Sequence, residues 1–156
     1  LILLYLMEQG LLRKPVIYVS YFLKRNQIEY YDRISEVRRS GNYEQWVRFF
    51  LEAVSAAAAD AMTSIEQLSA LHNQSLELLP QTTRSKDNIR AVFDYLEQHP
   101  IIDIKHTATV LGVSYNTVSA AVKKLMELDI LMETTNAARN RVFAYEKYLA
   151  ILREGT

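Results

Sequence analysis

Residues 106–125, HTATVLGVSYNTVSAAVKKL, carry the pattern of two helices that meet at a sharp turn. Ala108 is small enough for two helices to cross closely, and Gly112 suits the turn between them. Ser114 follows the turn, and its hydroxyl can accept a hydrogen bond from a free backbone N–H group, so it is the expected cap of the second helix. The inward residues of that helix are Val118, Ala121, Val122 and Leu125.

Regular structure is also predicted on both sides of this stretch. Upstream, four apolar residues at i, i+3, i+4 and i+7 predict one buried helix face, and Pro100 ends that helix. Asp103 is the expected cap of the next helix. The buried face comprises Ile89, Val92, Phe93 and Leu96. The downstream elements are strands over residues 130–133 and 142–145, a polar loop over 134–141 and a helix over 146–153.

The order helix, helix, sharp turn, helix and hairpin resembles the winged helix-turn-helix domains of bacterial regulators. The resemblance implies double-stranded DNA as a partner, with the helix that begins at Ser114 in a major groove. Asn116 would then pair with an adenine edge, and Ser119 with a phosphate or a base. The residues expected to contact DNA are Ser114, Tyr115, Asn116, Ser119 and Lys123 on the helix, and Arg139 and Arg141 on the hairpin.

The charge balance keeps a second interpretation of this domain open. The chain has 18 Lys and Arg residues against 18 Asp and Glu residues, and its net charge is zero. Residues 1–80 carry a net charge of −1 and residues 81–156 a net charge of +1, so neither half is the strongly basic body of a tight phosphate binder. The same fold also serves for protein docking or dimerisation, and this alternative stays beside DNA binding.

Composition and length restrict the remaining classes of function. A chain of 156 residues with 49% hydrophobic and 23% charged residues is typical of one or two small globular domains. The absence of cysteine excludes disulfides and thiolate metal sites, and the three histidines show no metal-ligand spacing. The apolar run Leu1–Met7 is far shorter than the roughly 20 residues that cross a membrane. We therefore expect a cytoplasmic protein with no metal site and no membrane partner.

The first half is predicted to be helical apart from a loop over residues 11–19. Ser20 is the expected cap of the second helix, and Asn42 begins the third, with Gln45 at the spacing of a capping box. This third helix is either continuous or broken near residues 73–75. The predicted helices cover residues 1–9, 20–39 and 42–79, and Gly10 and Gly41 end the first two. The residues of the predicted core are Trp46, Phe49 and Phe50, with Ala53, Ala57 and their neighbours at close helix approaches.

Residues 80–84, PQTTR, form the best boundary in the chain. The segment is polar, begins with proline and separates two differently patterned halves. We therefore predict a helical domain over residues 1–80, a linker over 81–84 and a second domain over 85–156.

Six features follow one another in order within about residues 1–55. They are an apolar helix that ends in GLL, a proline, the segment YVS, an N…EYY segment, the turn VRRSGNYEQW and the helix FFLEAV. This order resembles the later part of a Fic (filamentation induced by cAMP) domain, and a winged domain that follows a Fic domain is also found in bacterial members. The resemblance implies a mostly α fold: a helical remnant of a Fic core, then a winged helix-turn-helix of three helices and a two-stranded β wing.

The resemblance also implies a parent enzyme that transfers AMP from ATP onto protein hydroxyls with the help of Mg²⁺. The family's catalytic signature, HPFxDGNGRxGR, would precede Leu1, and GNG does not occur in these 156 residues. We therefore expect this chain alone to be inactive, with no catalytic residue and no bound cofactor, and the sequence does not indicate the parent's protein substrate. Its first helix would then expose an apolar stripe, so we expect either a homodimer through that stripe or imperfect folding of the first half.

One part of the family's nucleotide site has counterparts in this chain. By the resemblance, Tyr31, Ile34 and Arg38 would wall the adenine side, and their spacing places them on one helical stripe. In the alternative interpretation, Tyr30, Ile34 and Val37 pack the core and Tyr31 lies at its margin. Three functions thus remain open: the C-terminal portion of a Fic-type AMP-transferase with a DNA-binding winged helix, a transcription regulator or DNA-tethered switch, and a winged helix used only for docking or dimerisation.

Overall fold

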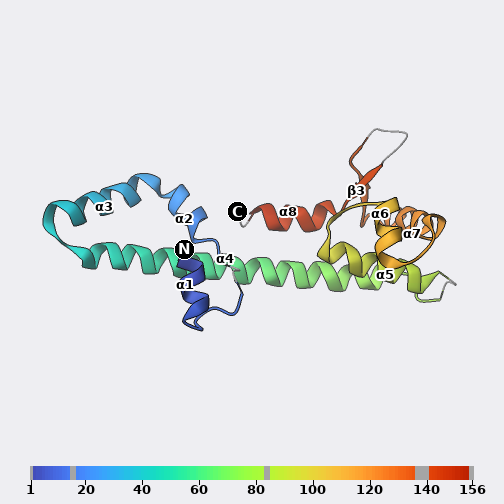
Figure 1. Ribbon diagram of the computed structural model, residues 1–156, viewed down its shortest axis with the longest axis horizontal. Coiled ribbons are helices and arrows are strands. Elements are labelled where there is room, and N and C mark those ends of the chain that lie inside the picture. Colours follow the sequence, from blue (N-terminus) through green and yellow to red (C-terminus); the bar gives the residue numbers. More distant parts are fainter. Residues whose placement is uncertain (1, 15–16, 83–84, 136–140, 155–156) are drawn as a thin grey trace. The chain divides into compact units, whose positions relative to one another are not determined.

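The computed structural model describes residues 2–14, 17–82, 85–135 and 141–154 (Figure 1). These residues are mostly helical and include one small antiparallel sheet of three strands, so the predicted mostly α class is confirmed. The chain divides into two compact units, one up to Glu66 with the last residues of the chain, and one from Gln67 to Arg153. We call them the first and the second unit and describe each by itself.

The first unit contains three short helices and the first part of a long one. Gly10 and Gly41 end the first and third of these helices with φ angles of +70° and +73°, as predicted, in the left-handed region that glycine adopts at little cost. Leu4 and Tyr5 on the first helix are exposed, as expected for its apolar stripe. Self-association through that stripe stays a prediction. The elements are α1 (Ile2–Glu8), α2 (Val19–Arg25), α3 (Gln27–Ser40) and the start of α4 (Tyr43–Leu78).

The prediction of one helix over residues 20–39 with Ser20 as its cap is wrong. The helix begins at Val19, which is buried in an apolar cluster, and Tyr18 precedes it without a side-chain cap. The helical segment is interrupted at Asn26, where α2 ends and α3 begins. The Asn26 side-chain amide donates to the Phe22 carbonyl oxygen at 2.9 Å, a local hydrogen bond of the kind by which asparagine competes with regular helix.

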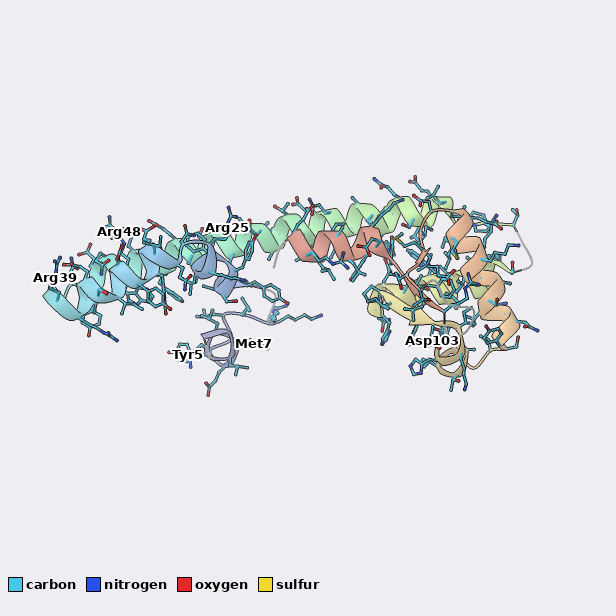
Figure 2. The ribbon with its side chains drawn as sticks, turned by 90° about the horizontal axis from the view of Figure 1, so that it is seen from above. Tyr5, Met7, Arg25, Arg39, Arg48 and Asp103 are labelled. Carbon is cyan, nitrogen blue, oxygen red and sulfur yellow. The ribbon has the colours of Figure 1, made fainter. Side chains whose placement is uncertain are left out.

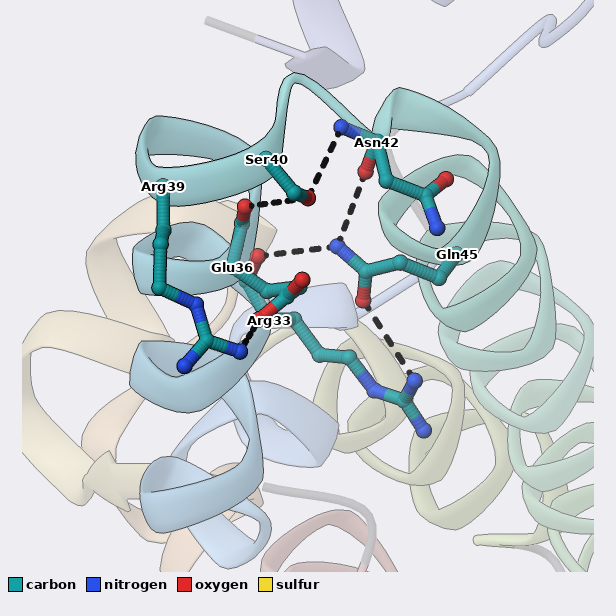
Figure 3. Close-up of polar contacts among 6 residues, drawn as sticks. All are labelled: Arg33, Glu36, Arg39, Ser40, Asn42 and Gln45. Atoms are coloured by element: carbon teal, nitrogen blue, oxygen red, sulfur yellow. Dashed lines mark hydrogen bonds and ion pairs between the residues drawn. The ribbon is translucent and has the colours of Figure 1, made fainter.

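Gln45 fastens the start of α4 to α3, although not as the predicted capping box (Figure 3). Its side-chain amide donates to the carbonyl oxygens of Arg33, at 2.9 Å, and Asn42, at 3.1 Å. The Asn42 N–H group donates instead to the Ser40 hydroxyl, at 3.2 Å. Arg39, near the end of α3, and Arg48, in the first turns of α4, both lie toward the end of the first unit where these two helices meet (Figure 2). The spacing of Asn42 and Gln45 thus predicted that the two residues contact each other, but not which groups form the hydrogen bonds. The Gln45 side-chain oxygen accepts from the Arg33 guanidinium and not from the Asn42 N–H group.

Aromatic side chains hold α4 against α2 and α3 in the first unit. The Trp46 ring lies 5.5 Å from the Tyr30 ring and 6.0 Å from the Phe49 ring, and Phe22 lies 6.0 Å from Phe49. Of the predicted aromatic core, Phe49 is buried, whereas Trp46 and Phe50 are half-buried. The buried residues of the adjoining cluster are Ile17, Val19, Ala53 and Ala57. The two alanines allow the close approach that the sequence indicated.

Helix α4 is continuous over 36 residues, so the unbroken alternative holds. The two units divide within it, after Glu66, upstream of the predicted linker at residues 81–84. Leu71, Leu76 and Leu79 explain this division, because they pack against the core of the second unit. No helix among the described residues, α4 included, combines the length and the hydropathy that crossing a membrane needs.

The core of the second unit lies between α5 (Lys86–Gln98), α6 (Ile104–Leu111) and α7 (Tyr115–Glu127). The predicted faces of α5 and α7 are all buried. Asp103 caps α6 by accepting from the His106 N–H group at 2.8 Å (Figure 2 labels Asp103), and Gly112 ends α6 with a φ of +65°. These caps and the turn confirm the helical plan that the sequence predicted for this part of the chain.

The sheet has one strand more than the sequence predicted. Its order is β1 (Ile101–Asp103), β3 (Val142–Ala144) and β2 (Met132–Glu133), with both pairs antiparallel. The predicted strand over residues 130–133 is shorter in the structure, because the N–H groups of Ile130 and Leu131 donate to the Leu125 carbonyl oxygen at the end of α7. The last helix, α8 (Glu146–Glu154), follows β3 as predicted.

Two polar contacts join α4 to the rest of the second unit. The hydroxyls of Ser75 and Tyr145 are 2.7 Å apart, and both residues are buried. His72 Nδ1 lies 2.6 Å from a carboxylate oxygen of Glu97 on α5. Burial is the main cause that raises the pKa of Tyr145, so its phenol stays neutral and keeps this hydrogen bond at neutral pH.

Removal of the Tyr145 hydroxyl should destabilise the second unit. Tyr145→Phe leaves the Ser75 hydroxyl buried without its partner, which costs about 1–3 kcal/mol. Tyr148→Phe is the matched control, because Tyr148 stacks on Tyr145 but is only half-buried. Urea unfolding followed by circular dichroism would measure both variants. Equal losses of unfolding free energy would contradict a specific role for the Ser75–Tyr145 hydrogen bond.

Candidate functional site

The N-terminus of α7 is fixed by its own cap and by the turn before it. The Ser114 hydroxyl accepts from the Thr117 N–H group at 3.1 Å, as the sequence predicted, and lies 2.8 Å from the Thr117 hydroxyl. Within the turn, the Val113 N–H group donates to the Ala108 carbonyl oxygen at 3.1 Å. The start of α7 therefore has a defined direction and an exposed surface.

The polar residues of α7 lie on the side opposite its buried face. At 100° per residue, Asn116, Ser119 and Lys123 fall on one stripe, about half a turn away from the buried Val118 and Leu125. Asn116 and Lys123 are exposed, and Ser119 is half-buried. Tyr115 lies at the edge of this stripe with 56% of its surface exposed. The structure thus brings together four of the residues that the sequence predicted for this helix, Tyr115, Asn116, Ser119 and Lys123, whereas Ser114 is the N-terminal cap.

Two lysines at or beyond the C-terminal end of α7 pair with carboxylates. Lys124 donates to Glu127 at 3.0 Å, and Lys147 on α8 donates to Asp129 at 2.6 Å. Among the residues that the structure describes, Lys123 forms no ion pair. The surface therefore carries little net positive charge, in agreement with the near-neutral composition of this half of the chain.

The β2–β3 hairpin places Arg141 beside Glu133. Arg141 Nε donates to Glu133 Oε1 at 2.7 Å, and Nη2 donates to Oε2 of the same carboxylate. The guanidinium also lies 5.2 Å from the centre of the Phe143 ring. Glu133 raises the pKa of Arg141, chiefly through these hydrogen bonds, and Arg141 lowers the pKa of Glu133. The other predicted hairpin contact, Arg139, lies outside the described residues.

Sequence reasoning missed Glu133 as a member of this site. The signal that was available is a pair of opposite charges at the ends of the predicted hairpin loop, residues 134–141, since Glu133 directly precedes the loop and Arg141 is its last residue. In an antiparallel pair such residues lie close enough to form a cross-strand ion pair.

The three residues predicted to wall a nucleotide lie along one side of α3. Tyr31 is 56% exposed, Ile34 is half-buried and Arg38 is exposed. The Tyr30 ring contacts the rings of Tyr31 and Trp46, but Tyr30, Ile34 and Val37 are only half-buried, so the core packing of the alternative interpretation is found only in part. An open hollow of about 980 Å³ lies along other residues of α3, which include Glu29, Asp32, Arg33 and Glu36, and none of the three predicted residues lines it.

The histidines lie in separate surroundings. His72 contacts Glu97, the His99 ring stacks on the Tyr95 ring at 4.3 Å, and His106 is exposed on α6. In the described parts of the chain, no group of three or more acidic, histidine or cysteine side chains could hold a metal ion. A search against models of known protein families finds no match to this chain.

Loss of the Ser114 cap should weaken α7. Ser114→Ala removes the side-chain acceptor of the Thr117 N–H group, which costs about 1 kcal/mol of unfolding free energy. Ser119→Ala on the same helix is the control and should change stability little, because Ser119 caps nothing. Urea unfolding of the two variants is the measurement. An unchanged stability of Ser114→Ala would show that the cap does not fix the start of α7.

Proposed function

We propose that this chain is the C-terminal portion of a Fic-type protein AMP-transferase, and that its second unit is a winged helix-turn-helix domain that binds double-stranded DNA. In this proposal, α6 and α7 are the helix-turn-helix, and the β2–β3 hairpin is the wing. The parent enzyme would use ATP and Mg²⁺, with Tyr31, Ile34 and Arg38 on the adenine side. The support for the Fic part is the order of the features within residues 1–55.

A single observation carries the DNA-binding part of the proposal. The capped start of α7 presents Tyr115 and Asn116 to solvent, Lys123 is exposed two turns further along, and the opposite face of the helix is buried. Helix-turn-helix proteins place the N-terminal residues of this helix against base edges in the major groove. An asparagine can form two hydrogen bonds with adenine there, and a lysine can contact guanine or a phosphate.

The charge of the site sets the expected strength of binding. Phosphate contacts supply most of non-specific affinity, and each contact adds to the salt dependence. Because carboxylates pair with Lys124 and Arg141, few basic side chains are available without rearrangement. The proposal therefore predicts weak binding to random duplex that depends on salt.

Titration of the chain with a random duplex at 50 mM and 200 mM salt tests the DNA-binding proposal. We expect binding at 50 mM salt that weakens at 200 mM, and Lys123→Ala should reduce the slope of log affinity against log salt by about 1. Lys147→Ala is the matched control, because it removes the same charge from a lysine that pairs with Asp129 beyond the C-terminal end of α7. Binding that does not depend on salt, or no binding at 50 mM, would contradict the proposal.

A separate assay addresses the Fic assignment. Because the catalytic signature is not among these 156 residues, incubation with labelled ATP should label neither the chain nor candidate target proteins. The upstream part of the encoding gene should specify an HPF…GNGR segment. Labelling by this chain alone, or a gene without that segment, would overturn the assignment.

The ion pairs of the second unit also support a competing function. The pairing of Lys124 with Glu127 and of Arg141 with Glu133 produces a mixed, nearly neutral surface, which suits docking to a protein or dimerisation. In that case the chain would bind no duplex at low salt. In the third candidate function, a transcription regulator or DNA-tethered switch, the winged helix-turn-helix domain would dominate.

A further inference from the structure

A carboxylate occupies the anion-binding side of the only hairpin arginine that the structure describes. Arg141 has Nε and one terminal nitrogen aligned on the two oxygens of Glu133, with Nε at 2.7 Å from Oε1. This two-pronged geometry is the one by which arginine binds phosphates as well as carboxylates. Glu133 therefore sits where a phosphate would bind.

The backbone of the hairpin holds Glu133 in this place. Glu133 pairs with Phe143 across the antiparallel strands, and the Thr134 N–H group donates to the Val142 carbonyl oxygen at 2.9 Å. The Val142 N–H group donates in turn to the Thr135 hydroxyl at 2.9 Å. The Phe143 ring lies against the guanidinium of Arg141. The register of the two strands thus keeps Glu133 and Arg141 close to each other.

Arg141 and the start of α7 both belong to the second unit. Tyr115, the first residue of α7, is exposed, and so is Arg141. In the proposed function, the hairpin and α7 contact the same duplex, so a phosphate bound at Arg141 would add to the contacts of α7.

We propose that Glu133 is an internal competitor for phosphate, which keeps Arg141 occupied and so limits the affinity of this surface for a nucleic-acid backbone. The nucleic-acid part of this inference rests on the proposed function. An exposed ion pair is weak and is screened by salt, so a phosphate can displace the carboxylate, but it binds less tightly than it would to a free arginine.

The first test uses an inorganic phosphate and needs no nucleic acid. The full chain, labelled with ¹⁵N, is titrated with pyrophosphate while the Nε–H resonance of Arg141 is followed by NMR. In Glu133→Gln we expect a saturable shift at a concentration about threefold to tenfold lower than in the unchanged protein, because the competing charge is gone. Equal titration curves in the two proteins would overturn the proposal.

The second test uses duplex DNA and a matched control. Glu127→Gln removes the same charge from the pair with Lys124 on α7, so it corrects for the change in net charge alone. We expect Glu133→Gln to raise duplex affinity about threefold to tenfold at low salt and to steepen the salt slope by up to about 1, and Glu127→Gln to do so clearly less. In an Arg141→Gln background, Glu133→Gln should have no effect.

The outcomes separate this inference from the proposed function. If Arg141 binds pyrophosphate more tightly in Glu133→Gln but no variant binds duplex, the competition stands and DNA binding fails. If duplex binds and Glu133→Gln behaves like Glu127→Gln, DNA binding stands and the competition fails. Glu133→Asp, which keeps the charge but shortens its reach, should lie between the unchanged protein and Glu133→Gln. It serves as the deciding variant if thermal melting shows that Glu133→Gln does not fold.

Discussion

The burial of one face of α7 determines what the second unit can present to a partner. Val118 and Leu125 are completely buried, and side chains of this kind each contribute on the order of 1.5–3 kcal/mol when they leave water. Rotation of α7 about its axis would expose them, so the opposite stripe has one orientation. Asn116 and Lys123 are therefore held at the surface by hydrophobic packing on the other side of the same helix.

The same principle explains why α4 contributes to both units. Its first part meets an aromatic cluster, and its last part packs Leu71 and Leu76 against the core of the second unit, which includes Leu79, the residue after the helix. The Ser75–Tyr145 hydrogen bond adds a polar contact that is satisfied only when this packing is in place. A proline and a polar loop after α4 look like a boundary in the sequence, but apolar contacts decide where a compact unit begins.

Local chemistry made much of this structure predictable from the sequence. The caps Asp103 and Ser114 and the turn at Gly112 depend on neighbouring residues alone, and all three are found as predicted. The interruption at Asn26 and the strand β1 were missed, because β1 has three residues and forms only by pairing with β3, some 40 residues later. The exposed stripe of α7 followed from helical periodicity. The Glu133–Arg141 pair did not, because it depends on the register of a hairpin.

The polar stripe of α7 and the hairpin arginine held by Glu133 both belong to the second unit. In the proposed function, this stripe and the hairpin form one nucleic-acid surface. The most direct measurement is a ¹H–¹⁵N NMR titration of the labelled chain with a short duplex at low salt. We predict that the amide signals of residues 114–123 and of Arg141 shift together. Shifts that spare these residues, or a spectrum that the duplex leaves unchanged, would contradict the claim.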